Sequence, residues 1–255
     1  MEKYARIKYE GQIKWVEVQS DNIGLVLLNT PFEPDIITSD EKIDLKNKSI
    51  EFLPVSQPKT VVGLGWNYKD LVGEKLKYDE PIIFLKSTHS VCGHNSKIEL
   101  SALHDKVWVE VELVIVISKR TKNVDAENAH THILGYTIGS DITAENILDR
   151  DWHLARSKAF ENYAPVGPFM VVGMNPNNVS LKSRINGKIY QDSTTSNMIL
   201  NIDEIISFVS SHIVLEKGDL IFTGSPKGAR DSIVKPGDRV EHIIENIGTM
   251  SFNIA

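Results

Sequence analysis

Apolar residues occupy every second position from residue 107 to residue 117, a period of two that predicts a β-strand. The opposite face of this strand carries Glu110 and Glu112, which therefore point the same way. Trp108 precedes them and Val114 and Val116 follow, so the second face is apolar at both ends. Because a strand that is apolar on both faces is usually covered on both, the pattern predicts two carboxylates side by side under cover.

Two covered carboxylates repel each other, so one of them has a raised pKa unless a cation joins them. Asp141 follows another apolar run, residues 133–138, and is a natural third oxygen donor. Three carboxylates without cysteine or histidine suit a hard dication such as Mg²⁺ or Mn²⁺, completed by water or substrate oxygens. From spacing alone, an edge strand whose glutamates point to water is an equal alternative.

The chain divides near two prolines. Apolar and polar residues alternate between residues 5 and 28, with Gly11 in the middle, which predicts a hairpin of short strands. Pro54 and Pro58 then bracket a short connector of the kind found between domains. We expect a small β-rich N-terminal domain over residues 1–56 and a second domain over residues 57–255, which opens with strands at 60–65 and 81–86.

The second domain also carries helix, hairpin and loop signals. Residues 143–160 are expected to form a helix with Thr143 as its N-cap, which delivers Lys158 towards its end. Residues 201–211 show helical spacing behind a capping Asn201, and Asn186 with Gly187 predicts a tight hairpin. The Gly-Ser-Pro loop that follows Thr223 lets backbone N–H groups approach a carboxylate or a phosphate closely.

Composition narrows the function to small-molecule chemistry. The formal net charge is -6 over 255 residues and no Lys/Arg run is present, which argues against nucleic-acid binding. The single cysteine, Cys92, excludes an internal disulfide and fits a reducing compartment. No apolar run has the length of a signal peptide core or a membrane span, so we expect a cytoplasmic protein that does not bind membranes.

An ordered set of short motifs resembles the fumarylacetoacetate hydrolase family from about residue 58 to the C-terminus. The motifs are Val-Val-Gly-Leu-Gly-Trp-Asn-Tyr at residues 61–68, Pro-Ile-Ile-Phe-Leu-Lys at 81–86, Glu-Val-Glu at 110–112, Gly-Ser-Asp at 139–141, Ser-Lys-Ala-Phe at 157–160, Asn-Gly at 186–187, Gln191, Gly-Asp at 218–219 and Thr-Gly-Ser-Pro at 223–226. Each motif alone is weak, but Glu-x-Glu followed by the aspartate and then the lysine is specific as a set.

The resemblance implies a fold that is mainly β with peripheral helices, a mixed β-sandwich-like roll, usually assembled as a homodimer. Its members act on 2-oxo acids and their enols at a bound metal, and include acylpyruvate and fumarylacetoacetate hydrolases, oxaloacetate decarboxylases and tautomerases, and 2-hydroxyhepta-2,4-diene-1,7-dioate isomerases. The matching positions are Glu110, Glu112 and Asp141 for the metal ligands, Lys158 for the lysine that faces the substrate oxygen, and Gln191, Thr223, Gly224, Ser225 and Pro226 near the substrate carboxylate.

Three of the motifs depart from the family pattern. Leu71 stands where a histidine forms an acid/base dyad with a glutamate, although that glutamate is retained as Glu74. Glu145 and Leu148 replace an arginine that faces the substrate and a glutamine. The usual Gly-Thr-Pro is Gly-Ser-Pro, which keeps a hydroxyl at Ser225.

The missing histidine shifts the expected chemistry away from hydrolysis. Hydrolysis of a C–C bond needs an activated water, which Leu71 cannot supply, and Glu74 would act as a base through water only with a pKa raised by burial. Isomerisation and decarboxylation depend more on the metal as electron sink, with Lys158 stabilising charge or moving a proton once burial and the metal lower its pKa. We therefore expect isomerisation, tautomerisation or decarboxylation of a 2-oxo dicarboxylate.

Two other functions stay open. One is a C–C bond hydrolase of the acylpyruvate or fumarylacetoacetate type, and the other is a catalytically silent protein that binds metal and ligand. For Lys158 alone, the alternative is an exposed lysine that interacts with a helix dipole.

Overall fold

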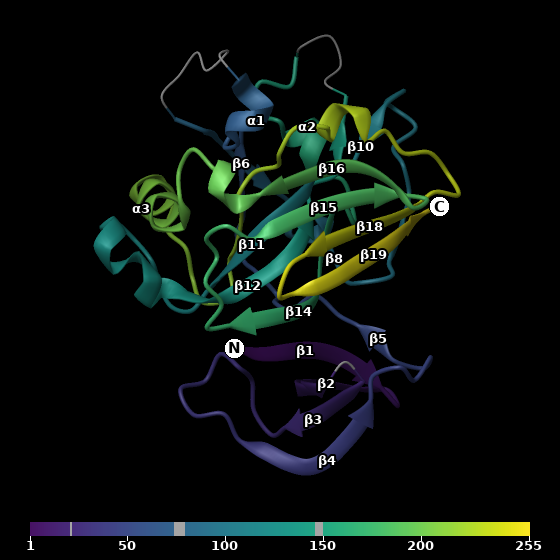
Figure 1. The fold of residues 1–255 in the computed structure, drawn as a ribbon, viewed down its shortest axis with the longest axis vertical. Helices are drawn as coiled ribbons and strands as arrows, with labels where there is room; N and C mark the ends of the chain where they lie inside the picture. Colours follow the sequence, from purple (N-terminus) through teal and green to yellow (C-terminus); the bar gives the residue numbers. More distant parts are fainter. Residues whose placement is uncertain (21, 74–79, 146–149) are drawn as a thin grey trace.

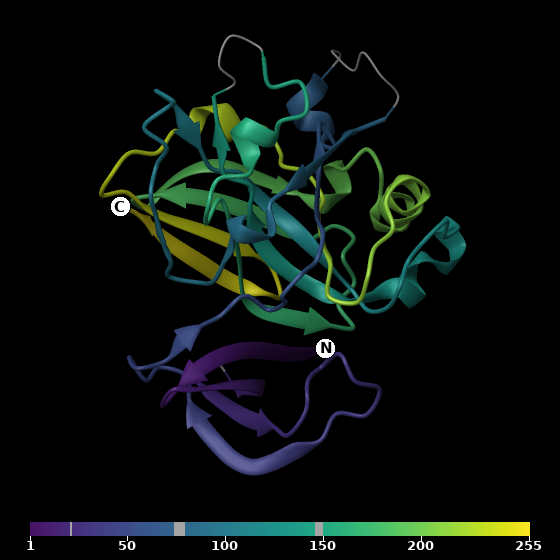
Figure 2. The same ribbon diagram turned by 180° about the vertical axis from the view of Figure 1, so that it is seen from behind.

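The structure is a computed structural model that describes residues 1–20, 22–73, 80–145 and 150–255. Strands make up most of the regular secondary structure, and the helices are short and lie at the periphery (Figures 1 and 2). The predicted fold class, mainly β with peripheral helices, is confirmed.

The larger sheet extends from the N-terminal strands at one end of the molecule to β6 and β7 at the other. Within the described residues its strand order is β4-β3-β2-β1-β14-β12-β11-β17-β6-β7, with β5 beside β1 and β8 beside β14. The strands are β1 (Glu2–Tyr9), β2 (Gln12–Ser20), β3 (Ile23–Leu27), β4 (Thr38–Asp44), β5 (Glu51–Phe52), β6 (Val61–Gly65), β7 (Ile82–Lys86), β8 (Val91–Cys92), β11 (Val111–Ile117), β12 (Ile133–Ser140), β14 (Ala164–Val172) and β17 (Leu220–Phe222).

A second sheet packs across β11, β12 and β14 and encloses the main core (Figure 1). Its order is β16-β15-β18-β19-β9, and β10 pairs separately with β13. These strands are β9 (Lys97–Ile98), β10 (Val107–Trp108), β13 (Thr143–Ala144), β15 (Ser180–Ile185), β16 (Lys188–Thr194), β18 (Arg239–Ile244) and β19 (Gly248–Ile254).

The helices cover the ends of the strands. They are α1 (Lys69–Val72), α2 (Ala155–Lys158), α3 (Ile202–His212) and the 3-10 turns η2 (Thr88–Ser90), η3 (Ala126–His132), η5 (Thr195–Asn197) and η6 (Ala229–Asp231). In α3, the Asn201 side chain accepts from the Asp203 and Glu204 backbone N–H groups, and Glu204 accepts from the Asn201 N–H. This reciprocal capping box confirms the helix predicted behind Asn201.

The stretch at residues 107–117 is covered on both faces, as predicted, but it is two strands rather than one. β10 ends at Trp108, and β11 begins at Val111. The odd-numbered residues of β11 pack in the main core, whereas Val114 and Val116 pack in a second core on the other side of the sheet. Glu110 thus lies between the two strands, and Glu112 is the second residue of β11.

Both predicted hairpins are confirmed. β1 pairs with β2 around Glu10 and Gly11, and β15 pairs with β16 around Asn186 and Gly187. Strand β4 was not expected, because residues 38–44 look polar and turn-rich in the sequence. Strand β1 also pairs with β14, so the larger sheet continues into the first 56 residues. A domain boundary at residues 56 and 57 stays a prediction.

The predicted helix over residues 143–160 is wrong. Thr143 is not an N-cap but part of β13, where its backbone pairs with Trp108, and of the described residues in this range only Ala155–Lys158 are helical. Leu154, with a φ of 58°, stands immediately before the helix. Pairing with β10 outweighs the helix signals of the charged residues here, because a short helix gains little from propensity alone.

Candidate functional site

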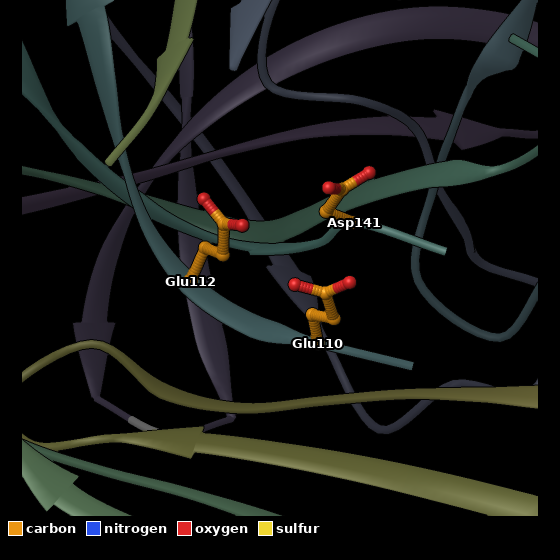
Figure 3. A group of neighbouring side chains, drawn as sticks. All are labelled: Glu110, Glu112 and Asp141. Atoms are coloured by element: carbon orange, nitrogen blue, oxygen red, sulfur yellow. The ribbon is translucent and has the colours of Figure 1, made fainter. Parts of the chain in front are cut away.

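Three carboxylates meet at the ends of two neighbouring strands. Glu112 lies in β11 opposite Gly139 of β12, and Asp141 directly follows β12. The Asp141 backbone N–H donates to the carbonyl of Glu110 at 3.0 Å, which brings the third residue alongside. One oxygen from each of Glu110, Glu112 and Asp141 lies within 4.8 Å of the others (Figure 3). The sequence therefore placed this cluster correctly, and the edge-strand alternative is wrong.

Each glutamate is held by a donor from a different part of the chain. Trp108 Nε1–H and Thr143 Oγ1–H both donate to Glu110 Oε1 at 2.8 Å. The backbone N–H of Gly224 donates to Glu112 Oε2 at 2.7 Å. Gly224 has a φ of +98°, and a side chain there would meet Asn67, so glycine permits this approach. The carboxylates are oriented before any ligand binds.

The electrostatics of the cluster differ from residue to residue. Burial, together with the charges of Asp141 and Glu110, raises the pKa of Glu112 well above its ordinary value. Burial also acts to raise the pKa of Asp141, but the ammonium groups of Lys158 and Lys86 outweigh it and lower that pKa. Glu112 is therefore the carboxylate of the cluster whose protonated form folding favours.

Lys158 lies inside the cluster, at the end of α2. Its Nζ donates to Asp141 Oδ2 and to Glu110 Oε1, the latter at 3.4 Å, and lies 4.6 Å from the centre of the Phe84 ring. Burial lowers the pKa of Lys158, but the carboxylates of Asp141 and Glu110 outweigh burial and raise it. The side chain is only 9% exposed, so the alternative of an exposed helix-end lysine is wrong.

A second buried lysine, Lys86, was missed by the sequence reasoning. It is the last residue of β7, its side chain is fully buried, and its Nζ lies 2.5 Å from Asp141 Oδ1. Burial lowers the pKa of Lys86, partly offset by Asp141. Strand alternation sets Lys86 on the inward face of β7 with buried Phe84 while Leu85 between them is exposed, but the continuous apolar run at residues 82–85 does not show in the sequence which face is buried. Asp141 is thus held by one lysine on each oxygen.

Replacing Lys86 with methionine is expected to lower the free energy of unfolding by about 3 kcal/mol, because it leaves a buried carboxylate oxygen without its cation. We expect the low end of the range for broken buried ion pairs, since Lys158 still holds the second oxygen. Lys106→Met is the matched control, because Lys106 and Glu145 form an exposed pair whose loss should cost about 1 kcal/mol or less. Urea denaturation of both variants measures the difference, and equal losses would contradict the role of Lys86.

The predicted substrate-side residues lie next to the cluster but are already hydrogen-bonded. Gln191 Oε1 accepts from the Val111 N–H at 3.0 Å, while its Nε2 donates to Ser225 Oγ at 2.8 Å and to the Pro226 carbonyl at 3.0 Å. Thr223 Oγ1 donates to the Leu113 carbonyl at 2.8 Å. These contacts fasten the loop at 223–226 to β11. A role in substrate binding stays a prediction for Gln191, Thr223, Gly224 and Ser225.

The positions that depart from the family pattern lie in different environments. Leu71, in α1, is partly buried and packs against the main core. Glu145 pairs with Lys106 at 3.2 Å, and both side chains are exposed. The predicted catalytic Glu74 and the departing Leu148 lie outside the described residues.

The donor set fits a divalent ion. Carboxylate oxygens are the ligands preferred by Mg²⁺ and Mn²⁺, and the described residues of the cluster contribute oxygen donors without thiol or imidazole. The nearby buried lysines offset part of the negative charge but leave Glu112 without a cationic hydrogen-bond partner among the described residues.

No helix in the described part of the chain is long and apolar enough to cross a membrane.

Comparison with known proteins identifies the same family that the sequence motifs resemble. Residues 60–255 match the family model described as "Fumarylacetoacetate (FAA) hydrolase C-terminal". The chain is 34% identical over 224 residues to the mitochondrial oxaloacetate tautomerase FAHD2A of Bos taurus, an alignment that covers 81% of this chain and 70% of that protein.

Solved structures are similar over nearly the whole chain. The 5-carboxymethyl-2-hydroxymuconate delta-isomerase from Mycobacterium smegmatis has a TM-score of 0.90 and 30% identity, with 99% of each chain covered. The 2-hydroxyhepta-2,4-diene-1,7-dioate isomerase from Mycobacterium marinum also has a TM-score of 0.90 and 30% identity, covering 100% of this chain and 98% of that one.

Proposed function

Since the chain belongs to the fumarylacetoacetate hydrolase family, we propose that it is a divalent-metal-dependent enzyme that acts on a 2-oxo acid or its enol. The reaction proposed is isomerisation, tautomerisation or decarboxylation of a 2-oxo dicarboxylate. The observation that carries this proposal is the convergence of Glu110, Glu112 and Asp141 on one point beside a buried Lys158. The tautomerase and isomerases named above support the reaction type.

Glu110, Glu112 and Asp141 would hold the ion, Mg²⁺ or Mn²⁺. Such an ion withdraws electrons from a 2-oxo group and so stabilises negative charge on its oxygen. The Lys158 ammonium is positioned to donate to a ligand oxygen that carries this charge, and Phe84 covers the lysine from one side. Oriented donors in a site shielded from water are worth more than the same donors in water.

Leu71 favours isomerisation over hydrolysis. An apolar side chain that packs on the core at the expected place of a histidine base cannot activate water, but it can help to keep water out. The C–C bond hydrolase remains the second candidate, with Glu74 as the proposed base. The silent metal- and ligand-binding protein is favoured only by the joint loss of histidine at residue 71 and arginine at residue 145.

The test is a comparison of two substrates with Mg²⁺ present. We expect the protein to tautomerise or decarboxylate oxaloacetate faster than it cleaves acetylpyruvate, followed by loss of enol absorbance with products separated by chromatography. A chelator should abolish the activity. Efficient cleavage of acetylpyruvate would support the hydrolase instead, and no turnover of any 2-oxo acid tested would support the silent binder.

A homodimer is proposed from the family alone, and a cytoplasmic location stays a prediction from the composition. Sedimentation at micromolar concentration should give twice the mass of one chain. A monomer under those conditions would remove the dimer from the proposal.

A further inference from the structure

The hydroxyl of Tyr68 is a buried polar group that has no role in the proposed reaction as described above. Tyr68 is fully buried, and its hydroxyl has no hydrogen-bond partner among the described residues. Buried polar groups almost always have a partner, because an unpaired one keeps the free-energy cost of losing water. A phenylalanine would fill the same space without that cost, so the hydroxyl calls for an explanation.

The backbone at Tyr68 is fastened to the loop that holds Glu112. Asn67 Nδ2 donates to the Thr223 carbonyl at 2.8 Å, and Asn67 Oδ1 accepts from the Leu200 N–H at 2.9 Å. Tyr68 itself forms a β-bridge with Met198. Gly224, the residue after Thr223, donates to Glu112. Tyr68 therefore has a fixed place beside the carboxylate cluster and not on a free loop.

The charges of Glu112 and Asp70 both act on the Tyr68 hydroxyl. Burial, then the charge of Glu112 and then that of Asp70, raises the pKa of Tyr68 well above its ordinary value, so the group keeps its proton. Asp70 Oδ2 accepts from Ser193 Oγ at 2.7 Å, but Asp70 Oδ1 is buried without a hydrogen-bond partner among the described residues. Two buried unpaired polar atoms thus occur two residues apart, in the segment that Asn67 fastens to Thr223, the residue before the Glu112 donor Gly224.

We infer that Tyr68 is a further ligand-binding residue of this site, whose hydroxyl donates a hydrogen bond to an oxygen of the bound 2-oxo acid. The inference rests on the proposed function. A neutral donor suits this place, because a third buried ammonium group would compete with the ion for the carboxylates. The hydroxyl gains a hydrogen-bond partner only when the ligand binds. The free-energy cost of burying it unpaired is then relieved, which strengthens binding of the ligand.

The test is Tyr68→Phe in the full chain, with Mn²⁺ and oxalate as probes in calorimetric titrations. With Mn²⁺ saturating, we expect oxalate to bind about 10- to 100-fold more weakly than to the parent, the loss typical of one hydrogen bond to a charged ligand. The affinity for Mn²⁺ alone and the melting temperature should not fall, because the variant removes an unpaired group. Tyr136→Phe is the control, since that hydroxyl is influenced by Asp203 and not by the cluster.

Different failures have different meanings. If the parent binds oxalate and Tyr68→Phe binds it equally well, the inference is overturned and the proposed function stands. A lower melting temperature together with weaker Mn²⁺ binding would show a structural role and also overturn it. A parent that binds no oxalate with Mn²⁺ would overturn the proposed function and the inference together. A crystal structure with both probes should place the Tyr68 hydroxyl within about 3.2 Å of an oxalate oxygen, and a larger separation counts against it.

Discussion

Replacing Glu112 with glutamine is expected to remove the proposed metal site. Glu112 is one of three carboxylates whose oxygens lie within 4.8 Å of one another, and a neutral amide is a much poorer ligand for Mg²⁺ or Mn²⁺. Loss of a residue that only supports a ligand typically costs about 10- to 100-fold in metal affinity, so loss of a ligand should cost more. Calorimetric titration with Mn²⁺ measures this, and Glu112→Ala should show the same loss.

The matched control is Glu145→Gln, the same chemical change at an exposed carboxylate that pairs with Lys106. Its Mn²⁺ affinity should equal that of the parent. Should Glu112→Gln bind Mn²⁺ as tightly as the parent, the assignment of the cluster as a metal site is wrong.

Glu112→Gln should also be more stable than the parent when a chelator is present. Burial and the neighbouring carboxylates raise the pKa of Glu112 in the folded protein, so folding favours its protonated form. The stability contributed by this group is fully present below its unfolded pKa, and it is lost as the pH rises through the folded pKa. Glutamine has no such pH dependence and can still accept from the Gly224 N–H. Urea denaturation across this range should therefore show a smaller loss of stability with rising pH in the variant.

The sequence predicted the carboxylate cluster because strand periodicity fixes which side chains share a face. Glu110 and Glu112 follow from that rule, whereas Asp141 was predicted only because it ends another apolar run. The register of β11 with β12, which sets Glu112 opposite Gly139, comes from the structure. The tight hairpin at Asn186 and the cap at Asn201 were also predicted, because both are local backbone chemistry.

The parts that could not be predicted depend on contacts between distant segments. Lys86 lies 55 residues from Asp141 along the chain, and no local pattern distinguishes a buried lysine from one at the end of a surface strand. Thr143 pairs with Trp108 from a strand of two residues, which is too short to show a period. The hydrogen bonds of Gln191 and Thr223 also join elements far apart in sequence, so the motifs indicated their neighbourhood but not their partners.

Replacing Leu71 with histidine is expected to raise cleavage of acetylpyruvate more than tautomerisation of oxaloacetate. If water activation limits cleavage in the parent, a restored general base should increase that rate by about 10²- to 10⁴-fold. In the proposed reaction, tautomerisation depends on the bound ion and on Lys158, neither of which the substitution changes directly. Because Leu71 packs only partly buried against the core, a ring of similar size is expected to fit in its place.

The matched control for this substitution is Leu71→Asn, which introduces a polar side chain without a base. Both variants should lose some exclusion of water, so any change that they share reports on packing, and only the excess in Leu71→His reports on base catalysis. The two reactions are followed by loss of enol absorbance with Mg²⁺ present and by chromatography of the products. A cleavage rate that stays the same in Leu71→His and Leu71→Asn would mean that residue 71 does not decide the reaction. An equal rise in both reactions of Leu71→His would mean that proton transfer limits tautomerisation as well, and the preference for isomerisation could then no longer rest on this position.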